Sequence, residues 1–100
     1  VHGVVFCSSV PEMEAPLHAF LLETLTHLQP QAFLHIHPTQ LNFPIDLSIY
    51  PREQIGADRI VNLCAASALY PNQSVIVIDF GTATTLNVLT EDKRFLGGVI

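Results

Sequence analysis

Basic residues are scarce in this sequence, which has four Lys and Arg against nine Asp and Glu and a formal net charge of −5. The four are Arg52, Arg59, Lys93 and Arg94, and they form no cluster or stripe along the chain. A protein that binds nucleic acid through its phosphates needs such a stripe. The composition therefore predicts that nucleic acid is not a partner.

Long apolar runs are also absent, since none approaches the roughly 20 residues of a membrane-spanning helix. The longest candidate, Val1 to Val10, is interrupted by His2, Gly3, Ser8 and Ser9. It has neither the basic flank nor the small-residue cleavage site of a signal peptide. We therefore expect no membrane association, and the lack of targeting signals predicts a cytoplasmic protein.

Cysteine is rare, and Cys7 and Cys64 do not form a Cys-x-x-Cys pair. We interpret both as reduced, buried thiols, although a disulfide between them stays open. The five histidines lack a zinc-type spacing with cysteine or with one another, although His35 and His37 alternate on an expected strand and His18 and His27 fall on an expected helix. They are predicted to be surface or hydrogen-bonded histidines rather than metal ligands.

What the chain does have is apolar residues, which make up 49% of it against 13% charged residues. Such a composition predicts a folded domain rather than a disordered segment. The chain begins at Val1, without an initiator methionine, and stops at Ile100, just after a pair of glycines. We therefore expect a fragment of a longer protein.

The first half predicts a strand, a helix, a second strand and a loop. Its expected segments are a strand at Val4–Cys7, a helix from Pro11 towards Pro30 with Leu17, Phe20, Leu21, Leu25 and Leu28 on one face, a strand at Ala32–Ile36, and a loop over His37–Pro51 with an extended piece at Asp46–Tyr50.

The second half predicts a helix followed by three strands. The helix is expected at Ala57–Tyr70, and the β-branched run Ser74–Ile78 predicts a strand buried on both faces. A strand at Leu86–Leu89, a turn at Thr90–Lys93 and an extended segment from Phe95 complete the chain. The resulting order, β-α-β, loop, α-β-β-β, predicts an α/β fold.

Chain length places two acidic residues at one edge of this fold. A helix from Ala57 to Tyr70 runs about 20 Å at 1.5 Å per residue. The following strand returns roughly 17 to 20 Å at 3.3 Å per residue. Asp58 at the helix start and Asp79 at the strand end should therefore lie at the same edge, which is where α/β proteins bind ligands.

The segment Asp79-Phe80-Gly81-Thr82-Ala83-Thr84-Thr85 follows the expected strand directly. A glycine lets the backbone approach a phosphate, and exposed N–H groups and hydroxyls can donate to its oxygens. An acidic residue beside such a loop commonly holds a cation. The alternative interpretation is an ordinary hairpin turn rich in threonine, and the motif alone favours neither.

The segment Gly56-Ala57-Asp58-Arg59 opens the second helix. An aspartate in a first turn is favoured by the helix dipole, so a solvated Asp-Arg pair at a helix start is one interpretation. In the functional interpretation, the carboxylate accepts the proton of a substrate hydroxyl and the guanidinium binds a substrate carboxylate.

Taken together, these motifs resemble type III pantothenate kinases. The resemblance rests on Ser9-Val10-Pro11, Gly56 to Arg59, Asp79 to Thr85 and Gly97-Gly98-Val99-Ile100, in the order and near the spacing of that family. It covers almost the whole chain, and the joint presence of the second and third blocks is far more specific than either block alone.

The resemblance implies a ribonuclease H-like fold of the actin-like ATPase kind, which includes acetate and sugar kinases and Hsp70. Residues 1–50 would form the C-terminal part of the first actin-like subdomain, and residues 51–100 the N-terminal part of the second. The implied activity is transfer of the ATP γ-phosphoryl group to pantothenate, which gives 4'-phosphopantothenate and begins coenzyme A synthesis.

The resemblance also implies roles for individual residues. Asp58 would be the catalytic base, and Gly56, Ala57, Asp58, Arg59 and Tyr50 would bind pantothenate. Gly81 and Thr82 would contact ATP, and Asp79 would bind a monovalent cation, potassium or ammonium. Magnesium would accompany ATP, and the family implies a homodimer.

Four departures from the family pattern limit these expectations. An Asp-x-Gly-Asn-Thr phosphate loop and a proline-glycine after the second glycine pair are absent, Asn87 replaces a common acid, and Tyr50 lies one residue closer to Gly56 than expected. We therefore expect this fragment to be inactive by itself and to bind ATP poorly. Two alternatives stay open: a non-catalytic relative that acts as a transcription accessory factor, and another small-molecule kinase of the same superfamily.

Overall fold

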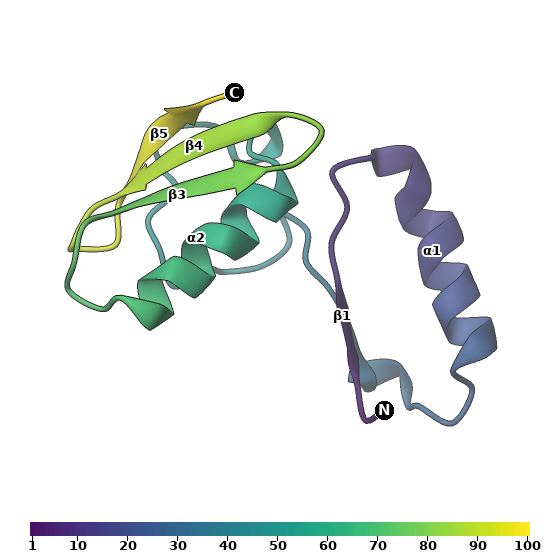
Figure 1. Cartoon of the computed structure of the whole chain (residues 1–100). Helices are drawn as coiled ribbons and strands as arrows, with labels where there is room; N and C mark the ends of the chain where they lie inside the picture. Colours follow the sequence, from purple (N-terminus) through teal and green to yellow (C-terminus); the bar gives the residue numbers. More distant parts are fainter.

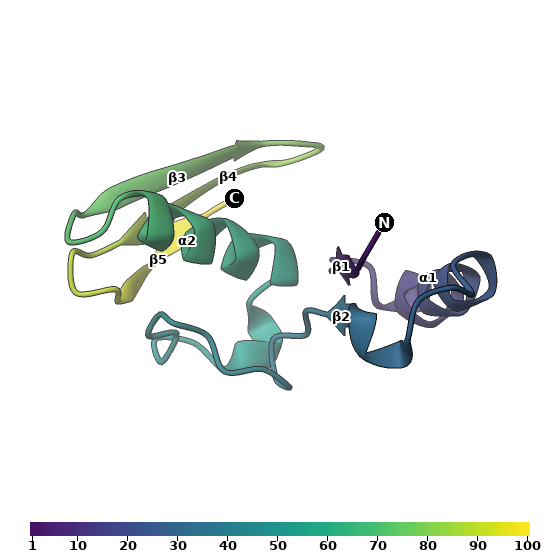
Figure 2. The ribbon, with the colours of Figure 1, turned by 90° about the horizontal axis from the view of Figure 1, so that it is seen from below.

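The computed structural model describes all 100 residues and has two units side by side, linked by a long loop (Figures 1 and 2). The predicted order of elements is confirmed. The elements are β1 (Val4–Phe6), α1 (Pro11–Thr24), β2 (Phe33–His35), α2 (Ala57–Leu69), β3 (Val75–Phe80), β4 (Thr84–Leu89) and β5 (Phe95–Val99), with single 3-10 turns at Pro30–Ala32 and Arg52–Gln54. None of the helices is long and apolar enough to cross a membrane.

The first unit is a β-α-β arrangement in which β1 and β2 pair in parallel, with Val5 opposite Leu34. The prediction that α1 extends towards Pro30 is wrong, because Leu25 has already left the helical backbone at φ −107° and ψ 56°. His27 therefore lies beyond the helix. No residue of α1 is buried, and Phe20 of its expected apolar face is 61% exposed.

The second unit is an antiparallel sheet in the order β3-β4-β5, with α2 packed against one face. Seven buried apolar residues form its core. They come from α2, from β4 and β5, and from the segment before α2: Ile60, Leu63, Leu89, Phe95, Ile45, Leu47 and Ile55. The hydrophobic core is therefore concentrated in this unit, and it includes Ile60 and Leu63 from the first half of α2.

The predicted burial of β3 on both faces is wrong. Side chains alternate along this strand, so that Val75 and Val77 face α2, whereas Ile76 is 64% and Phe80 82% exposed. An antiparallel sheet with a helix on one side needs only one apolar face. The β-branched run correctly predicted a strand but not how many layers cover it within these 100 residues.

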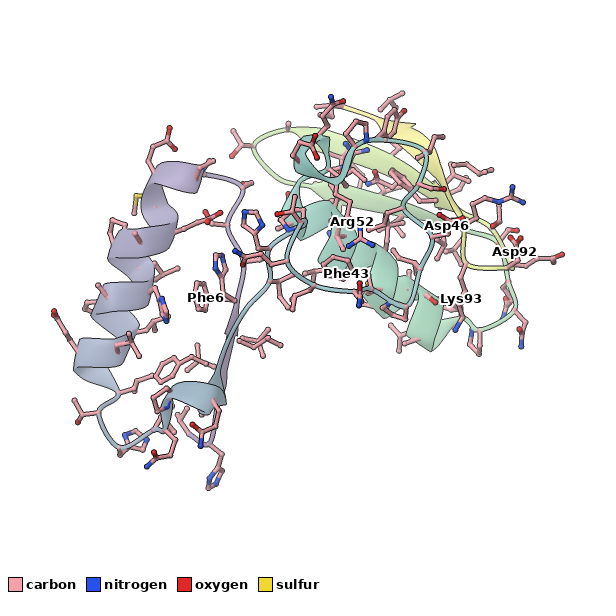
Figure 3. All side chains as sticks on the ribbon, turned by 180° about the vertical axis from the view of Figure 1, so that it is seen from behind. Phe6, Phe43, Asp46, Arg52, Asp92 and Lys93 are labelled. Carbon is pink, nitrogen blue, oxygen red and sulfur yellow. The ribbon has the colours of Figure 1, made fainter.

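The segment between the two units is held by a few specific contacts (Figure 3). Asp46 forms an isolated bridge with Arg94, in which its N–H donates to the carbonyl of Lys93 at 2.8 Å. Arg52 donates to the carbonyl of Leu41 at 2.7 Å and lies 5.7 Å from the centre of the Phe43 ring. The expected extended piece is thus limited to this one bridge.

Candidate functional site

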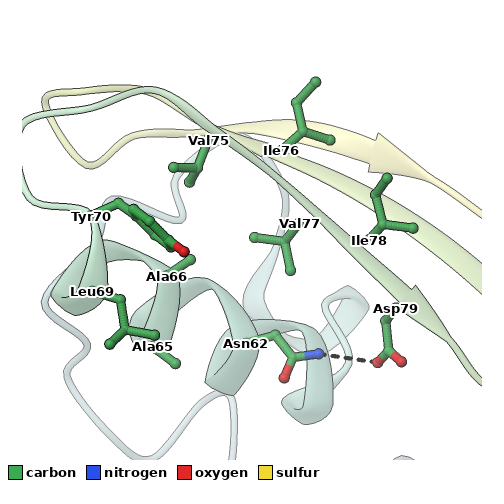
Figure 4. Close-up of a pocket in the computed structure, with 10 residues that line it drawn as sticks. All are labelled: Asn62, Ala65, Ala66, Leu69, Tyr70, Val75, Ile76, Val77, Ile78 and Asp79. Carbon is green, nitrogen blue, oxygen red and sulfur yellow. Dashed lines mark hydrogen bonds between the residues drawn. The ribbon is translucent and has the colours of Figure 1, made fainter.

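Asp58 and Asp79 lie at the same edge of the second unit, as chain length predicts. The start of α2 and the end of β3 meet on the side that faces β1 and α1 (Figure 1). Asn62, one helical turn after Asp58, donates to Oδ2 of Asp79 at 3.0 Å (Figure 4). One amide therefore links the helix start to the strand end and fixes the Asp79 carboxylate.

The carboxylate of Asp58 folds back over Gly56. A side chain at position 56 would collide with Oδ1 of Asp58, so the glycine makes room for this carboxylate. Asp58 is half-buried and makes neither a hydrogen bond nor an ion pair through its side chain. Both of its oxygens are therefore available to a ligand.

The same carboxylate lies close enough to act on Cys7, which follows β1. Burial raises the pKa of the Cys7 thiol, and the negative charge of Asp58 raises it further. Burial alone raises the pKa of Cys64. Both cysteines are free, and both are only half-buried, so the predicted full burial of these thiols is wrong.

This proximity gives a first testable prediction. Asp58→Asn removes the charge that raises the pKa of Cys7, so more thiolate forms at a fixed, mildly alkaline pH. Alkylation of Cys7 by iodoacetamide, followed by mass spectrometry, should become faster. Cys64 is the internal control, and its rate should stay unchanged. An unaltered Cys7 rate would contradict the placement of Asp58 beside the end of β1.

The segment Asp79 to Thr85 forms the hairpin that joins β3 and β4. Asp79 pairs with Thr85 and Phe80 with Thr84, and the N–H of Gly81 donates to the carbonyl of Ala83 at 3.1 Å. Gly81 and Thr82 are exposed at the tip. The hairpin interpretation is thus correct as a description of the backbone, and it leaves the Thr82 hydroxyl and the tip free to meet a phosphate.

Arg59 points to the other side of α2, towards β4 and β5. Its Nε donates to Oδ1 of Asn87 at 2.7 Å, and its guanidinium carbon lies 5.8 Å from the centre of the Phe95 ring. Nη2 is buried and has no acceptor. Arg59 therefore carries unused donors and no carboxylate partner.

Tyr50 and Arg59 line one hollow of about 330 Å³, together with Gln54, Gly98 and Ile100. From the sequence, only the family resemblance predicts that Tyr50 and Arg59 bind the same ligand. The structure places them side by side because Tyr50 packs edge-on against Phe95, with ring centres 6.1 Å apart. Two of the residues predicted to bind pantothenate thus share one hollow.

Gly56 and Ala57 face a different hollow, of about 340 Å³, which they share with Ser8 and Ser9 at the end of β1. The Gly56 to Arg59 block thus reaches three directions: this hollow, the Asp79 edge and the Tyr50 hollow. Gly81 and Thr82 line none of these hollows. The structure therefore gathers the residues predicted to bind pantothenate around the start of α2 and leaves the hairpin tip apart from them.

The histidines do not form a metal centre, because no group of three or more His, Cys, Asp and Glu side chains could hold a metal ion. His35 stacks on Phe6 with ring centres 4.6 Å apart, and its Nε2 lies 3.7 Å from Oε2 of Glu14. His37 hydrogen-bonds to the Thr39 hydroxyl at 2.9 Å.

The largest hollow, about 650 Å³, is an apolar groove between α2 and β3 (Figure 4). Ala65, Leu69 and Val77 are among its lining residues, and the Asn62–Asp79 hydrogen bond closes one end. Only this polar end adjoins the predicted site. The groove follows the free edge of β3, which pairs with β4 alone.

Two asparagines were missed by the sequence prediction: Asn62 as the partner of Asp79, and Asn87 as the partner of Arg59. The spacing of Asn62 from Asp58, four residues along a helix, could have placed it on the same face. Nothing in the sequence indicates the second pair, because Arg59 and Asn87 lie 28 residues apart.

This arrangement is that of an α/β protein whose ligand groups lie where a strand ends beside a helix start. Comparison with known proteins identifies the family within this broad class. The sequence model of the family described as type III pantothenate kinase matches residues 1–100. The chain belongs to the type III pantothenate kinase family.

Sequence identity to individual proteins of this family supports the assignment. The type III pantothenate kinase of Legionella pneumophila strain Corby is 36% identical over 102 residues, which cover 100% of this chain and 37% of that protein. Type III pantothenate kinase 2 of Francisella tularensis subsp. holarctica strain OSU18 is 34% identical over 100 residues, with the same coverage of 100% and 37%. The chain thus spans a little over a third of the length of these relatives.

Proposed function

We propose that the protein containing this chain transfers the γ-phosphoryl group of ATP to pantothenate, the first step of coenzyme A synthesis. The observation that carries the proposal is the block Gly56 to Arg59 at the start of α2, beside the edge that holds Asp79, in a chain whose whole length matches this family. Phosphoryl transfer depends on positioning and charge stabilisation more than on covalent chemistry, and this edge offers groups for both.

Asp58 is the proposed catalytic base. Its carboxylate makes no other hydrogen bond, lies in the first turn of α2 and is half-buried, so it can accept the proton of the pantothenate hydroxyl. Gly56 and Ala57 line the hollow beside it and are proposed to contact the substrate backbone. This assignment separates the reacting hydroxyl from the substrate carboxylate, which Arg59 and Tyr50 would hold.

Gly81 and Thr82 are the proposed ATP contacts. They lie exposed at the tip of the β3–β4 hairpin, where the Thr82 hydroxyl can donate to a phosphate oxygen. Magnesium is proposed to accompany the ATP phosphates, whose negative charge it would offset.

Asp79 is the proposed ligand of a monovalent cation, potassium or ammonium. Its Oδ2 is held by Asn62, which leaves Oδ1 to face a cation. A bound cation would supply positive charge beside the phosphates. The fit is partial, because no second acidic side chain of this chain joins Asp79 in a metal-holding group.

We further propose that the two units are the end of the first and the beginning of the second actin-like subdomain, divided near residue 50. The reaction uses ATP, so we assign it to the cytoplasm, and the family resemblance supports a homodimer. The exposed apolar side chains Ile76, Ile78 and Phe80 on β3 are consistent with further protein covering that face, in the parent chain or in a second copy.

The test is a coupled kinase assay on the full-length protein with pantothenate, ATP, potassium and magnesium. We expect turnover that depends on pantothenate. Other sugar and carboxylate substrates of the superfamily serve as controls. Turnover with one of them alone would favour a different kinase, and no turnover with any substrate would favour a non-catalytic relative.

Arg59→Ala gives a more specific prediction. Loss of a charge-assisted hydrogen bond costs about 1.5–3 kcal/mol, so KM for pantothenate should rise about tenfold or more while KM for ATP stays near the wild-type value. Arg94→Ala is the matched control, because Arg94 lies on the exposed β4–β5 turn beside Asp92. An equal rise in both KM values would argue against Arg59 as the pantothenate anchor.

A further inference from the structure

Asn87 is the most deeply buried polar side chain of the second unit, with 1% of its surface exposed. It lies in the middle of β4 and faces α2 and β5. Burying a side-chain amide is unfavourable unless it is hydrogen-bonded. Its Oδ1 accepts the hydrogen bond from Arg59 at 2.7 Å, and its Nδ2 donates to the Thr85 hydroxyl at 3.4 Å. The stronger of its two hydrogen bonds is therefore the one to Arg59.

The surroundings of Arg59 leave its charge uncompensated. Its contacts are the neutral amide of Asn87 and the face of the Phe95 ring, and both ion pairs of the chain lie elsewhere, at His35–Glu14 and Arg94–Asp92. Nη2 is buried without an acceptor. A guanidinium held in this way keeps its full charge and its remaining donors for an anion.

Gly98 preserves this arrangement. A side chain there would lie 2.6 Å from Oδ1 of Asn87 and 2.8 Å from Nη2 of Arg59, and it would collide with the backbone carbonyl of Leu86. The pair therefore occupies space that a glycine leaves open, beside the hollow lined by Tyr50, Arg59 and Gly98.

We propose that Asn87 is a positioning residue that sets the substrate affinity of this site. Its amide oxygen fixes Nε of Arg59, so that the other guanidinium N–H groups face the carboxylate of the substrate in the hollow beside Tyr50. Because the amide is neutral, it orients the guanidinium without neutralising it. This inference rests on the proposed function, in which Arg59 anchors the pantothenate carboxylate.

A double-mutant cycle on the full-length protein tests the proposal. We would measure the Kd of pantothenate by calorimetry, and KM and kcat by the coupled assay, for Asn87→Ala, Arg59→Ala and the double variant. Asn87→Ala should weaken pantothenate binding about tenfold or more, with a smaller change in kcat. The double variant should bind no worse than Arg59→Ala alone, because residues that act through each other are not additive.

Two further variants separate positioning from a general structural role. Asn87→Asp keeps an acceptor for Nε but adds a negative charge that neutralises the guanidinium, so its Kd should stay weaker than that of wild type. Asn42→Ala, at an exposed asparagine, should leave Kd unchanged. Thermal unfolding would verify that each variant folds. Additive losses in the cycle, or a wild-type Kd in Asn87→Asp, would overturn the proposal.

Different results would exclude the proposed function and the role of Asn87. A wild-type protein that neither binds nor phosphorylates pantothenate would remove the proposed function itself. A wild-type protein that binds pantothenate, together with an additive cycle, would remove only the role of Asn87.

Discussion

Asp58→Asn in the full-length protein should lower kcat for pantothenate phosphorylation by about 10²- to 10⁴-fold, the usual contribution of a general base. The substitution keeps the shape of the side chain and removes its negative charge, and with that charge its ability to take a proton. Asp58 makes no hydrogen bond through its carboxylate, so no structural partner loses its acceptor. The loss should therefore appear in kcat far more than in KM for pantothenate.

The chain provides a matched control for this experiment. Glu12 is the second residue of α1, just as Asp58 is the second residue of α2, and it is exposed. Neutralising either acid removes the same favourable interaction with a helix dipole, about 0.3 to 1 kcal/mol. Glu12→Gln should therefore show a similar small change in stability with kcat preserved. If Asp58→Asn keeps a kcat within a few-fold of wild type, Asp58 is not the base.

The position of this carboxylate could be predicted from the sequence because it depends on local rules. Helix rise and strand rise are fixed quantities, so a helix and a strand of these lengths joined by the tight turn at Pro71-Asn72 bring Asp58 and Asp79 to one edge. The structure places Asn62 between the two ends, with its amide on Asp79. Patterns that span one helix and one strand were therefore sufficient for this edge.

Features that depend on distant parts of the chain could not be predicted. The Arg59–Asn87 hydrogen bond joins residues 28 positions apart, and Ile45 and Leu47 reach the core from a segment whose prolines predict a loop. The exposure of Ile76 and Phe80 is a further example, since a β-branched run gives no information about how many layers cover a strand. Contacts of this kind are decided by packing rather than by local preference.

Phe95 connects the core of the second unit with the proposed carboxylate site, and Phe95→Ala should be the most destabilising single change in it. The ring is 1% exposed within the core cluster. Truncating a buried phenylalanine to alanine lowers the free energy of unfolding by about 3–5 kcal/mol, because apolar surface is no longer buried and a cavity is left behind. Urea unfolding of the full-length protein, followed by circular dichroism, should show a correspondingly lower midpoint. An unchanged midpoint would contradict the central place of Phe95.

Phe95→Leu separates packing from the site. Leucine fills much of the same volume, so most of the stability should return, but it offers no aromatic face to Arg59 and no edge contact to Tyr50. A cation over a ring is stabilised by about 0.5–2 kcal/mol, so KM for pantothenate should rise by about two- to thirtyfold in a protein that stays folded. A stable Phe95→Leu protein with wild-type KM would show that the ring supports the core alone. A raised KM would show that the same side chain closes the core on one side and holds Arg59 in place on the other.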